Sequence, residues 1–301
     1  MSLIFKGITK VYDKKKVIDS VNLEIRNSEI MGFAGINGAG KTTTMKIAAG
    51  VIHPDSGDVL VDGISMLKDG KRAKFNITWV PENSILDPFR TPISTFLEFG
   101  SYLGFTRSMI LERSDKAMED VGLNELMKRR IGSFSNGMKK RLMIAFSLFQ
   151  DPTNFLLDET FTGLDPKATL MLREILTGLR DKKKSVLLSS HVLSELDGIV
   201  DRMAVIHSGR IVSIANTDEI SRFSVLAIKC EGDKSGVVAV LETFGEVTTK
   251  QDIYELIPSN GTSANQWVIG IALENAGYKV LSIERKGNAV ERYFFEKIGE
   301  T

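Results

Sequence analysis

Apolar and polar positions alternate through the first thirty residues, from about residue 3 to residue 30. A period of two is typical of strands with one buried face, so this region predicts antiparallel β-strands. The next segment, Ile30–Ala34, is continuously apolar, which is typical of a strand buried on both faces. A helical pattern follows over residues 41–50 and ends near a glycine.

Further along the chain, short apolar strands alternate with charged helical segments. We expect strands at residues 77–80, 154–158, 185–189 and 203–207, and helices at residues 66–75 and 92–130. Strands that alternate with helices predict a mostly parallel sheet with helices on both faces. The fold class is therefore α/β.

The pattern breaks at residues 214–224, and we expect a domain boundary near residue 220. Beyond it the expected elements are a strand (224–230), a helix (234–243), a strand (246–258), a helix (263–276), a strand (278–285) and a last helix (288–298). The sequence thus predicts two domains, residues 1–220 and residues 221–301, of which the second is a small α+β unit without a recognisable chemical motif.

Composition narrows the setting in which the chain acts. With 39 basic and 38 acidic side chains, its net charge of +1 creates no field for gathering nucleic acid, so no nucleic-acid partner is expected. The single cysteine, Cys230, suits a reducing cytoplasm. No apolar run approaches the roughly 20 residues that span a bilayer. We expect a soluble chain that depends on another protein for any membrane location.

The segment Gly35-Ile36-Asn37-Gly38-Ala39-Gly40-Lys41-Thr42 lies between the apolar strand and the helix. Its glycines allow backbone N–H groups to turn toward phosphate oxygens, and the helix directs its positive dipole end at the same anion. Lys41 would contact the β- and γ-phosphates, and the Thr42 hydroxyl would bind Mg²⁺. A glycine-rich turn without a ligand is the alternative, which the preceding strand and following helix disfavour.

Two acids, Asp158 and Glu159, end the apolar strand expected at residues 154–158. Carboxyl ends of parallel strands lie on the ligand side of such sheets, so Asp158 would hold Mg²⁺ through water. Glu159 is the candidate general base that activates the attacking water. The alternative is an acidic strand end that caps a helix, which the following Gly163-Leu164-Asp165 disfavours.

Between these two motifs stands Phe134-Ser135-Asn136-Gly137-Met138-Lys139-Lys140-Arg141. Ser135 can cap a helix that starts at Asn136 and leaves its first N–H groups free for an anion. The three basic residues oppose the helix dipole, so they either meet something negative or form a basic solvent face.

Taken together, these motifs resemble the ATP-binding subunits of ABC transporters over roughly residues 3–215. The resemblance implies a P-loop ABC ATPase domain with antiparallel strands, a parallel core sheet and a helical subdomain at about residues 84–135. It also implies that two chains sandwich ATP, so the expected partner is a second copy or a paralogous ATPase.

The resemblance assigns roles to individual residues. The implied ATP contacts are Tyr12, Gly35, Asn37, Gly38, Ala39, Gly40, Lys41, Thr42 and Thr43. Across the dimer, Ser135, Asn136 and Gly137 would reach the γ-phosphate held by the partner. His191 matches the switch histidine that positions Glu159, and Asp165 belongs to the loop that communicates across the dimer. An ordinary strand tyrosine and a structural histidine are the alternatives for Tyr12 and His191.

Two departures from the common family pattern refine the resemblance. Glu82 replaces the usual glutamine and would be a Mg²⁺ ligand that adds negative charge. The signature reads FSNGM, and together with Glu82 it is similar to the drug- and antibiotic-exporter branch, as is the helix implied at residues 289–294. The function implied is an ATP-hydrolysing subunit that drives a separate membrane permease and is peripheral at the inner face of the cell membrane.

The helical subdomain carries a set of aromatic residues: Phe89, Phe96, Phe99, Tyr102 and Phe105. In the family, this region receives a helix of the permease, and residues 85–90 are expected at the exposed edge of that groove. The alternative is that most of the aromatics fill a small helical core.

The rival class is a soluble ABC ATPase that acts in repair, translation or cluster assembly. Repair proteins of that kind insert long coiled coils between the phosphate loop and the signature, and translation factors carry two ATP units in tandem; this sequence has neither feature. A small-molecule P-loop kinase should lack both the signature and His191.

Overall fold

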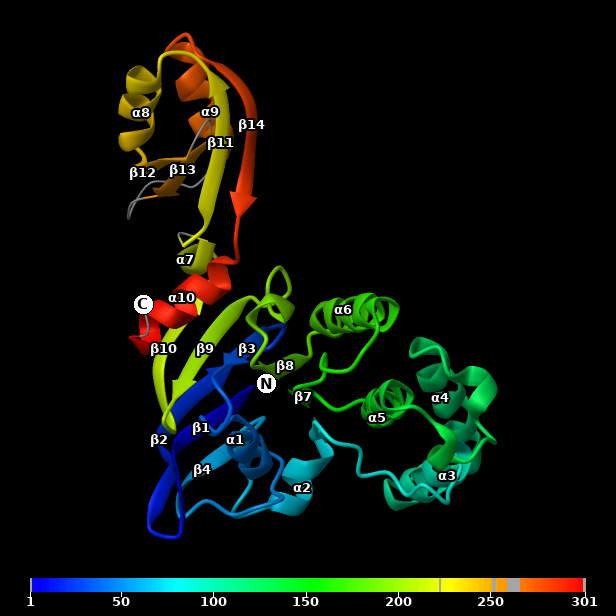
Figure 1. Cartoon of the computed structure of the whole chain (residues 1–301). Helices are drawn as coiled ribbons and strands as arrows, with labels where there is room; N and C mark the ends of the chain where they lie inside the picture. Colours follow the sequence, from blue (N-terminus) through cyan, green and yellow to red (C-terminus); the bar gives the residue numbers. More distant parts are fainter. Residues whose placement is uncertain (1, 222, 251–252, 259–265, 300–301) are drawn as a thin grey trace. The chain divides into compact units, whose positions relative to one another are not determined.

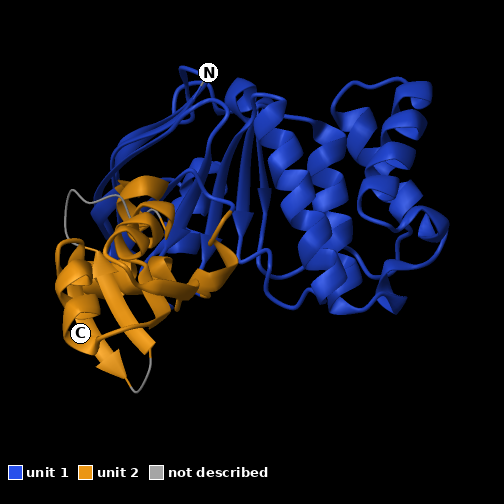
Figure 2. Ribbon diagram, turned by 90° about the horizontal axis from the view of Figure 1, so that it is seen from above, with its two compact units in different colours: residues 1–191, 199–214 blue, residues 192–198, 215–301 orange. Residues whose placement is uncertain are grey.

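The structure is a computed structural model that describes residues 2–221, 223–250, 253–258 and 266–299. These residues form two compact units, which Figure 2 distinguishes by colour. The first unit comprises residues 1–191 and 199–214, and the second comprises residues 192–198 and 215–301. Each unit has a sheet and a core of its own.

An antiparallel sheet opens the first unit, with strand order β2-β1-β4-β5. Its strands are β1 (Leu3–Tyr12), β2 (Lys15–Ile25), β4 (Ser56–Val61) and β5 (Ile64–Ser65). Buried and exposed positions alternate along β2, as the sequence pattern predicts. Strands β4 and β5 were not predicted; they follow the helix at the phosphate loop, and β4 pairs with β1 while β5 pairs with β4.

A six-stranded sheet forms the centre, in the order β10-β9-β3-β8-β7-β6. Its strands are β3 (Ile30–Ala34), β6 (Ile77–Val80), β7 (Asn154–Asp158), β8 (Ser185–Ser190), β9 (Arg202–His207) and β10 (Arg210–Asn216). The pairs β3/β8, β3/β9, β7/β8 and β6/β7 are parallel, which confirms the predicted parallel core. Every residue of β3, β7 and β8 is buried, so these strands read as continuous apolar runs.

Helices surround this sheet and extend beyond it (Figure 1). They are α1 (Lys41–Ala48), α2 (Gly70–Phe75), α3 (Pro92–Tyr102), α4 (Arg107–Asp120), α5 (Asn136–Gln150) and α6 (Pro166–Asp181). The helix expected at 66–75 is shorter than predicted, because Asp69 caps it by accepting from the Arg72 N–H. The span expected at 92–130 is broken at Gly104, whose φ of +81° ends a helical turn.

Aromatic rings fill the core between α3, α4 and α5. Phe96 lies 4.1 Å from Phe146 and 5.0 Å from Phe149 between ring centroids, and Phe105 lies 5.7 Å from Phe149. Phe89 and Tyr102 differ, since 81% and 80% of their surfaces are exposed. The aromatic residues therefore divide into a packed core and an exposed pair.

The second unit contains a βαββαβ arrangement: β11 (Val225–Glu231), α8 (Lys234–Glu242), β12 (Gly245–Lys250), β13 (Ile253–Pro258), α9 (Gln266–Asn275) and β14 (Lys279–Lys286). Its sheet has the order β12-β13-β11-β14, the topology of a split βαβ fold. Its core comprises Leu226, Ile228, Val237, Leu241, Tyr254, Leu256, Ile269 and Leu273.

The second unit corrects one expectation from sequence. The single strand predicted at residues 246–258 is wrong, because β12 and β13 pair antiparallel from Gly245↔Pro258 to Lys250↔Ile253. Residues 263–265 of the predicted helix lie outside the described residues, and α9 covers the rest. Two short helices complete the unit, α7 (Thr217–Ser221) and α10 (Ala289–Ile298). No helix in the described part of the chain combines the length and apolar character needed to cross a bilayer.

The aromatic core of the helical subdomain yields a stability prediction. Phe149 is 1% exposed and contacts three other rings, so Phe149→Ala should lower the free energy of unfolding by about 3–5 kcal/mol. Tyr102→Ala, at an exposed ring on the same subdomain, should change it by less than about 0.5 kcal/mol. Urea unfolding followed by circular dichroism measures both; equal losses would contradict the assigned core.

Candidate functional site

The loop between β3 and α1 has the backbone conformation that its glycines predict. Gly38 and Gly40 have φ values of +81° and +111°, and the Ala39 N–H donates to the Ile36 carbonyl at 3.1 Å. The φ of Gly40 strains any residue with a side chain, and a Cβ there would also lie 3.1 Å from the Val17 carbonyl and 2.5 Å from Ile18 Cδ1. Residues 36–38, which include Asn37, are exposed, whereas Gly35 and residues 39–41 are buried. Thr43 is half-buried in the first turn of α1.

The β1–β2 hairpin lies against this loop through Ile18, and Tyr12 is in the same hairpin. Tyr12 pairs with Lys15 at the turn, and 45% of its surface is exposed. The Lys10 ammonium lies 5.4 Å from its ring centroid. The ring is therefore accessible for stacking and already sits beside a cation.

Lys41 joins the phosphate loop to the acidic end of β7. Its Nζ donates to the Gly35 carbonyl at 2.6 Å and lies 3.2 Å from Glu159 Oε1. Both side chains are only 6% exposed. Glu159 Oε1 has no directional hydrogen bond, so its contact with Lys41 is an ionic attraction. In a site with so little water, that attraction is strong.

The other carboxylate oxygen of Glu159 contacts His191. His191 Nδ1 lies 2.7 Å from Glu159 Oε2, and the His191 backbone N–H donates to the same oxygen at 3.2 Å. This geometry places the proton on Nδ1, which leaves Nε2 free. Glu159 itself has a φ of +48°, an uncommon conformation for a side chain with a Cβ. The base candidate is thus fixed by partners on two loops.

Ser189, in β8, connects the two acids and was not expected from the sequence. Its Oγ donates to Asp158 Oδ1 at 2.7 Å and accepts from the Glu159 N–H at 3.0 Å. The only available signal was a pair of serines at the end of an otherwise apolar strand. A buried hydroxyl there must find polar partners, and the neighbouring strand end supplies them.

Asp158 is fully buried, and burial raises the pKa of its carboxyl. Hydrogen bonds from Ser189 and Thr42 lower that pKa, while the charges of Glu159 and Glu82 raise it further. Oδ2 of Asp158 has no hydrogen-bond partner. Two hydroxyls and two carboxylates therefore act on a buried carboxyl group that still has one unpartnered oxygen.

This donor set fits a hard cation such as Mg²⁺, which prefers carboxylate and hydroxyl oxygens. Among the described residues, no group of three or more His, Cys, Asp or Glu side chains is placed to hold a metal alone.

The signature segment begins α5, as expected. Ser135 is the N-cap, and its Oγ accepts from the Met138 N–H at 3.2 Å. A Cβ on Gly137 would lie 3.3 Å from the Gly163 carbonyl, so this glycine allows a close approach to the loop after β7. Figure 1 shows α5 apart from α1, the helix that follows the phosphate loop.

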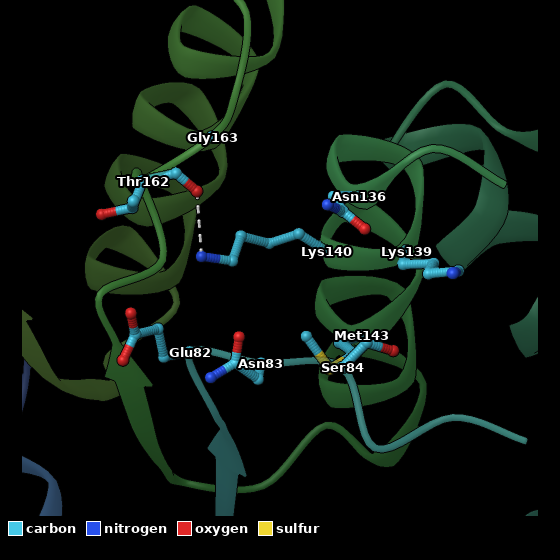
Figure 3. A pocket seen from close by; sticks show the side chains of 9 residues that line it. All are labelled: Glu82, Asn83, Ser84, Asn136, Lys139, Lys140, Met143, Thr162 and Gly163. Atoms are coloured by element: carbon cyan, nitrogen blue, oxygen red, sulfur yellow. Dashed lines mark hydrogen bonds between the residues drawn. The ribbon is translucent and has the colours of Figure 1, made fainter.

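A cleft of about 260 Å³ opens beside the signature helix (Figure 3). It is lined by Glu82, Asn83, Ser84, Asn136, Lys139, Lys140, Met143, Thr162 and Gly163. Of the three basic residues at the start of α5, Lys140 is buried and donates to backbone carbonyls, and Arg141 donates to the Val121 carbonyl at 3.2 Å. These two side chains therefore bind neutral backbone carbonyl groups of their own chain rather than forming a basic solvent face.

Asp165 supplies the helix cap that was the alternative role for the acids of β7. It is the N-cap of α6, and its Oδ1 accepts from the Ala168 N–H at 2.7 Å. Asp158 and Glu159 are therefore not needed for capping. Their burial has to be explained by the site itself.

Comparisons with known proteins agree with this geometry. A family model described as "ABC transporter" matches residues 18–162. The bacitracin transport ATP-binding protein BcrA of Bacillus licheniformis is 30% identical, over 99% of this chain and 98% of its own length. The linearmycin resistance ATP-binding protein LnrL of Bacillus subtilis is 27% identical, over 98% of both chains.

Solved structures lead to the same family. An ATP-binding subunit of an ABC transporter matches with a TM-score of 0.69 and 26% identity, over 74% of this chain and 92% of its own length. The chain therefore belongs to the ABC transporter family, as an ATP-binding and ATP-hydrolysing subunit. The predicted family and α/β fold class are confirmed, and the non-transport alternative is not supported.

The buried charge of Asp158 yields a prediction on stability. Because its pKa is raised in the folded chain, the folded state retains a proton more readily than the unfolded state. The free energy of unfolding therefore falls as pH rises through the interval between the ordinary pKa of 3.8 and the raised value. The variant Asp158→Asn has no carboxyl to titrate, so its free energy of unfolding should not fall in this way. In EDTA and without nucleotide, we expect this free energy to exceed that of the wild type by about 1 kcal/mol at about pH 7.

Urea unfolding at two pH values measures this difference, which should narrow near pH 4 as the wild-type carboxyl protonates. Asp165→Asn is the matched control, because asparagine caps a helix as well as aspartate does. A variant Asp158→Asn that is less stable than wild type near pH 7 would contradict the raised pKa.

Proposed function

We propose that the chain is the ATPase subunit of a membrane exporter and that Glu159 is its general base. The observation that carries the proposal is the buried contact of Glu159 with both Lys41 and His191 at the end of β7. In this contact, the ammonium that would bind phosphate and the imidazole that would orient the base each lie against one oxygen of the Glu159 carboxylate. The relatives named for bacitracin transport and linearmycin resistance support an exporter.

ATP binds with its phosphates on the loop of residues 35–43 and its adenine on Tyr12. The Lys41 ammonium leaves its ion pair with Glu159 and pairs with the incoming phosphates instead, because the phosphates carry more negative charge. Thr42, Asp158 and Glu82 would hold Mg²⁺, which would neutralise charge on the phosphates.

Released from Lys41, the Glu159 carboxylate accepts a proton from the attacking water at Oε1. His191 keeps its hold on Oε2 and so orients the carboxylate. The Nε2 atom of the imidazole is the ring nitrogen left for contact with a phosphate oxygen. In this scheme Lys41 binds the phosphates, His191 orients the carboxylate, and Glu159 accepts the proton.

A second ATPase chain completes each site, either a copy of this chain or a paralogue. Ser135, Asn136 and Gly137 begin α5, where the first N–H groups have no intrahelical partner and attract an anion. These residues would close on the phosphates held by the other chain. Asp165, exposed at the start of α6, would lie on the same dimer face.

The permease would dock at a mostly apolar cleft of about 310 Å³ between the central sheet and the helical subdomain. The cleft is lined by Thr78, Trp79, Pro81, Ile85, Leu86, Thr95, Phe99, Met143, Phe146 and Ser147. Ile85, which lines the cleft, has 76% of its surface exposed, and Phe89, four residues further along the chain, has 81% exposed. Docking there would hold the chain at the inner face of the cell membrane. The cleft residue Pro81 directly precedes Glu82, one of the candidate Mg²⁺ ligands.

The base assignment predicts that Glu159→Gln lowers kcat for ATP hydrolysis by roughly 100-fold or more, because an amide accepts no proton from water. The variant should still bind ATP and accumulate as an ATP-bound dimer, measured by light scattering with Mg²⁺-ATP. Lys41→Ala is the control and should form no dimer. A monomeric variant with phosphotransferase activity would defeat the proposal.

The docking assignment predicts that Ile85→Asp weakens association with a co-expressed permease by roughly tenfold or more, since a buried unpaired charge is costly. Co-purification in detergent and ATPase activity in proteoliposomes measure the effect. Val51→Asp, at a 56% exposed apolar residue outside the cleft, should leave both unchanged. Coupling that survives Ile85→Asp would place the permease elsewhere.

A further inference from the structure

Lys140 makes an unusual connection between the signature helix and the base-bearing turn. Its Nζ donates to the Glu159 carbonyl at 2.7 Å and to the Thr162 carbonyl at 3.0 Å. Figure 3 shows its side chain leaving α5 and crossing to the loop that contains Thr162. Lys140 is 6% exposed, so these carbonyls stabilise an ammonium that has little access to water.

The turn that accepts the hydrogen bonds of Lys140 has an uncommon backbone conformation. Glu159 adopts a φ of +48°, and Thr160 is fully buried with a hydroxyl that has no partner. The Glu159 N–H is fixed by Ser189, and its carbonyl is fixed by Lys140. With both ends of the residue held, the direction of its side chain is determined by the backbone.

We propose that Lys140 is a positioning residue for ATP hydrolysis, which ties the signature helix to the catalytic turn of its own chain. The inference rests on the proposed role of Glu159 as the base. Lys140 lies four residues after Asn136, one helical turn along α5, so both move with the same rigid helix.

A consequence follows for the two sites of a dimer. The start of α5 meets the ATP of the partner, whereas Glu159 acts on the ATP of its own chain. A shift of α5 on closing over the partner's ATP reaches Glu159 directly through Lys140. Through Lys140, the orientation of Glu159 in one ATP site therefore depends on whether ATP occupies the other site.

Lys140→Met tests this role, because methionine keeps the length and removes the donor. We expect kcat of the full chain with Mg²⁺-ATP to fall roughly 10- to 100-fold, the scale of a misplaced catalytic group. KM should stay within about threefold, since no ATP contact is lost. ATP-driven dimerisation in a Glu159→Gln background should be unchanged. Lys140→Arg, which retains the donors, should recover most of kcat.

The matched control is Lys184→Met. Lys184 is another largely buried lysine that donates to a backbone carbonyl, that of Asp151 at the other end of α5. The same substitution there should leave kcat within about twofold of wild type. If Lys140→Met fails to fold, Lys140→Gln provides the test, because its neutral amide still donates to a carbonyl.

A kcat for Lys140→Met equal to wild type would overturn the inference. A loss of kcat that Lys140→Arg does not recover would also overturn it, and so would a loss of ATP-driven dimerisation alongside the loss of kcat. Either result would indicate a purely structural role for Lys140. Failure of the proposed function is recognised separately: if Glu159→Gln retains activity, the base is wrong whatever Lys140 does.

Discussion

The buried charge pair of Lys41 and Glu159 is the constraint on which the rest of the site depends. Two ions that are each 6% exposed cost several kcal/mol to desolvate, and the fold must supply partners for both. The Gly35 carbonyl satisfies Lys41, and His191 satisfies the second oxygen of Glu159. A pair held this tightly by the chain is poised to exchange one partner for a phosphate.

The central sheet explains why these groups meet. β3, β8 and β7 are parallel neighbours, so the loops after them emerge at one edge. Register completes the arrangement, since Ala34 pairs with Ser190 and Asp158 pairs with Ser189. The phosphate loop, the acidic pair and His191 follow these positions directly. The helical subdomain adds the signature helix, which Lys140 attaches to the same edge.

Much of this was accessible from sequence, because local pattern determines it. Continuous apolar runs predicted the buried strands, and the glycine spacing predicted the loop at residue 40. What failed depends on distant partners. The hairpin of β12 and β13 was missed because the polar run at residues 248–252 contains no glycine or proline to mark a turn. Ser189 and Lys140 were missed because a buried serine or lysine is recognised only once its acceptors on another element are known.

The roles assigned to these residues share one central claim: Lys41 leaves Glu159 for the phosphates while the other holds on Glu159 persist. A crystal structure of the wild-type chain with Mg²⁺ and a non-hydrolysable ATP analogue measures this directly. The account predicts Lys41 Nζ within hydrogen-bonding distance of a phosphate oxygen, with the bonds of His191 and Lys140 to Glu159 retained. Lys41 still paired with Glu159 beside a bound nucleotide would contradict it.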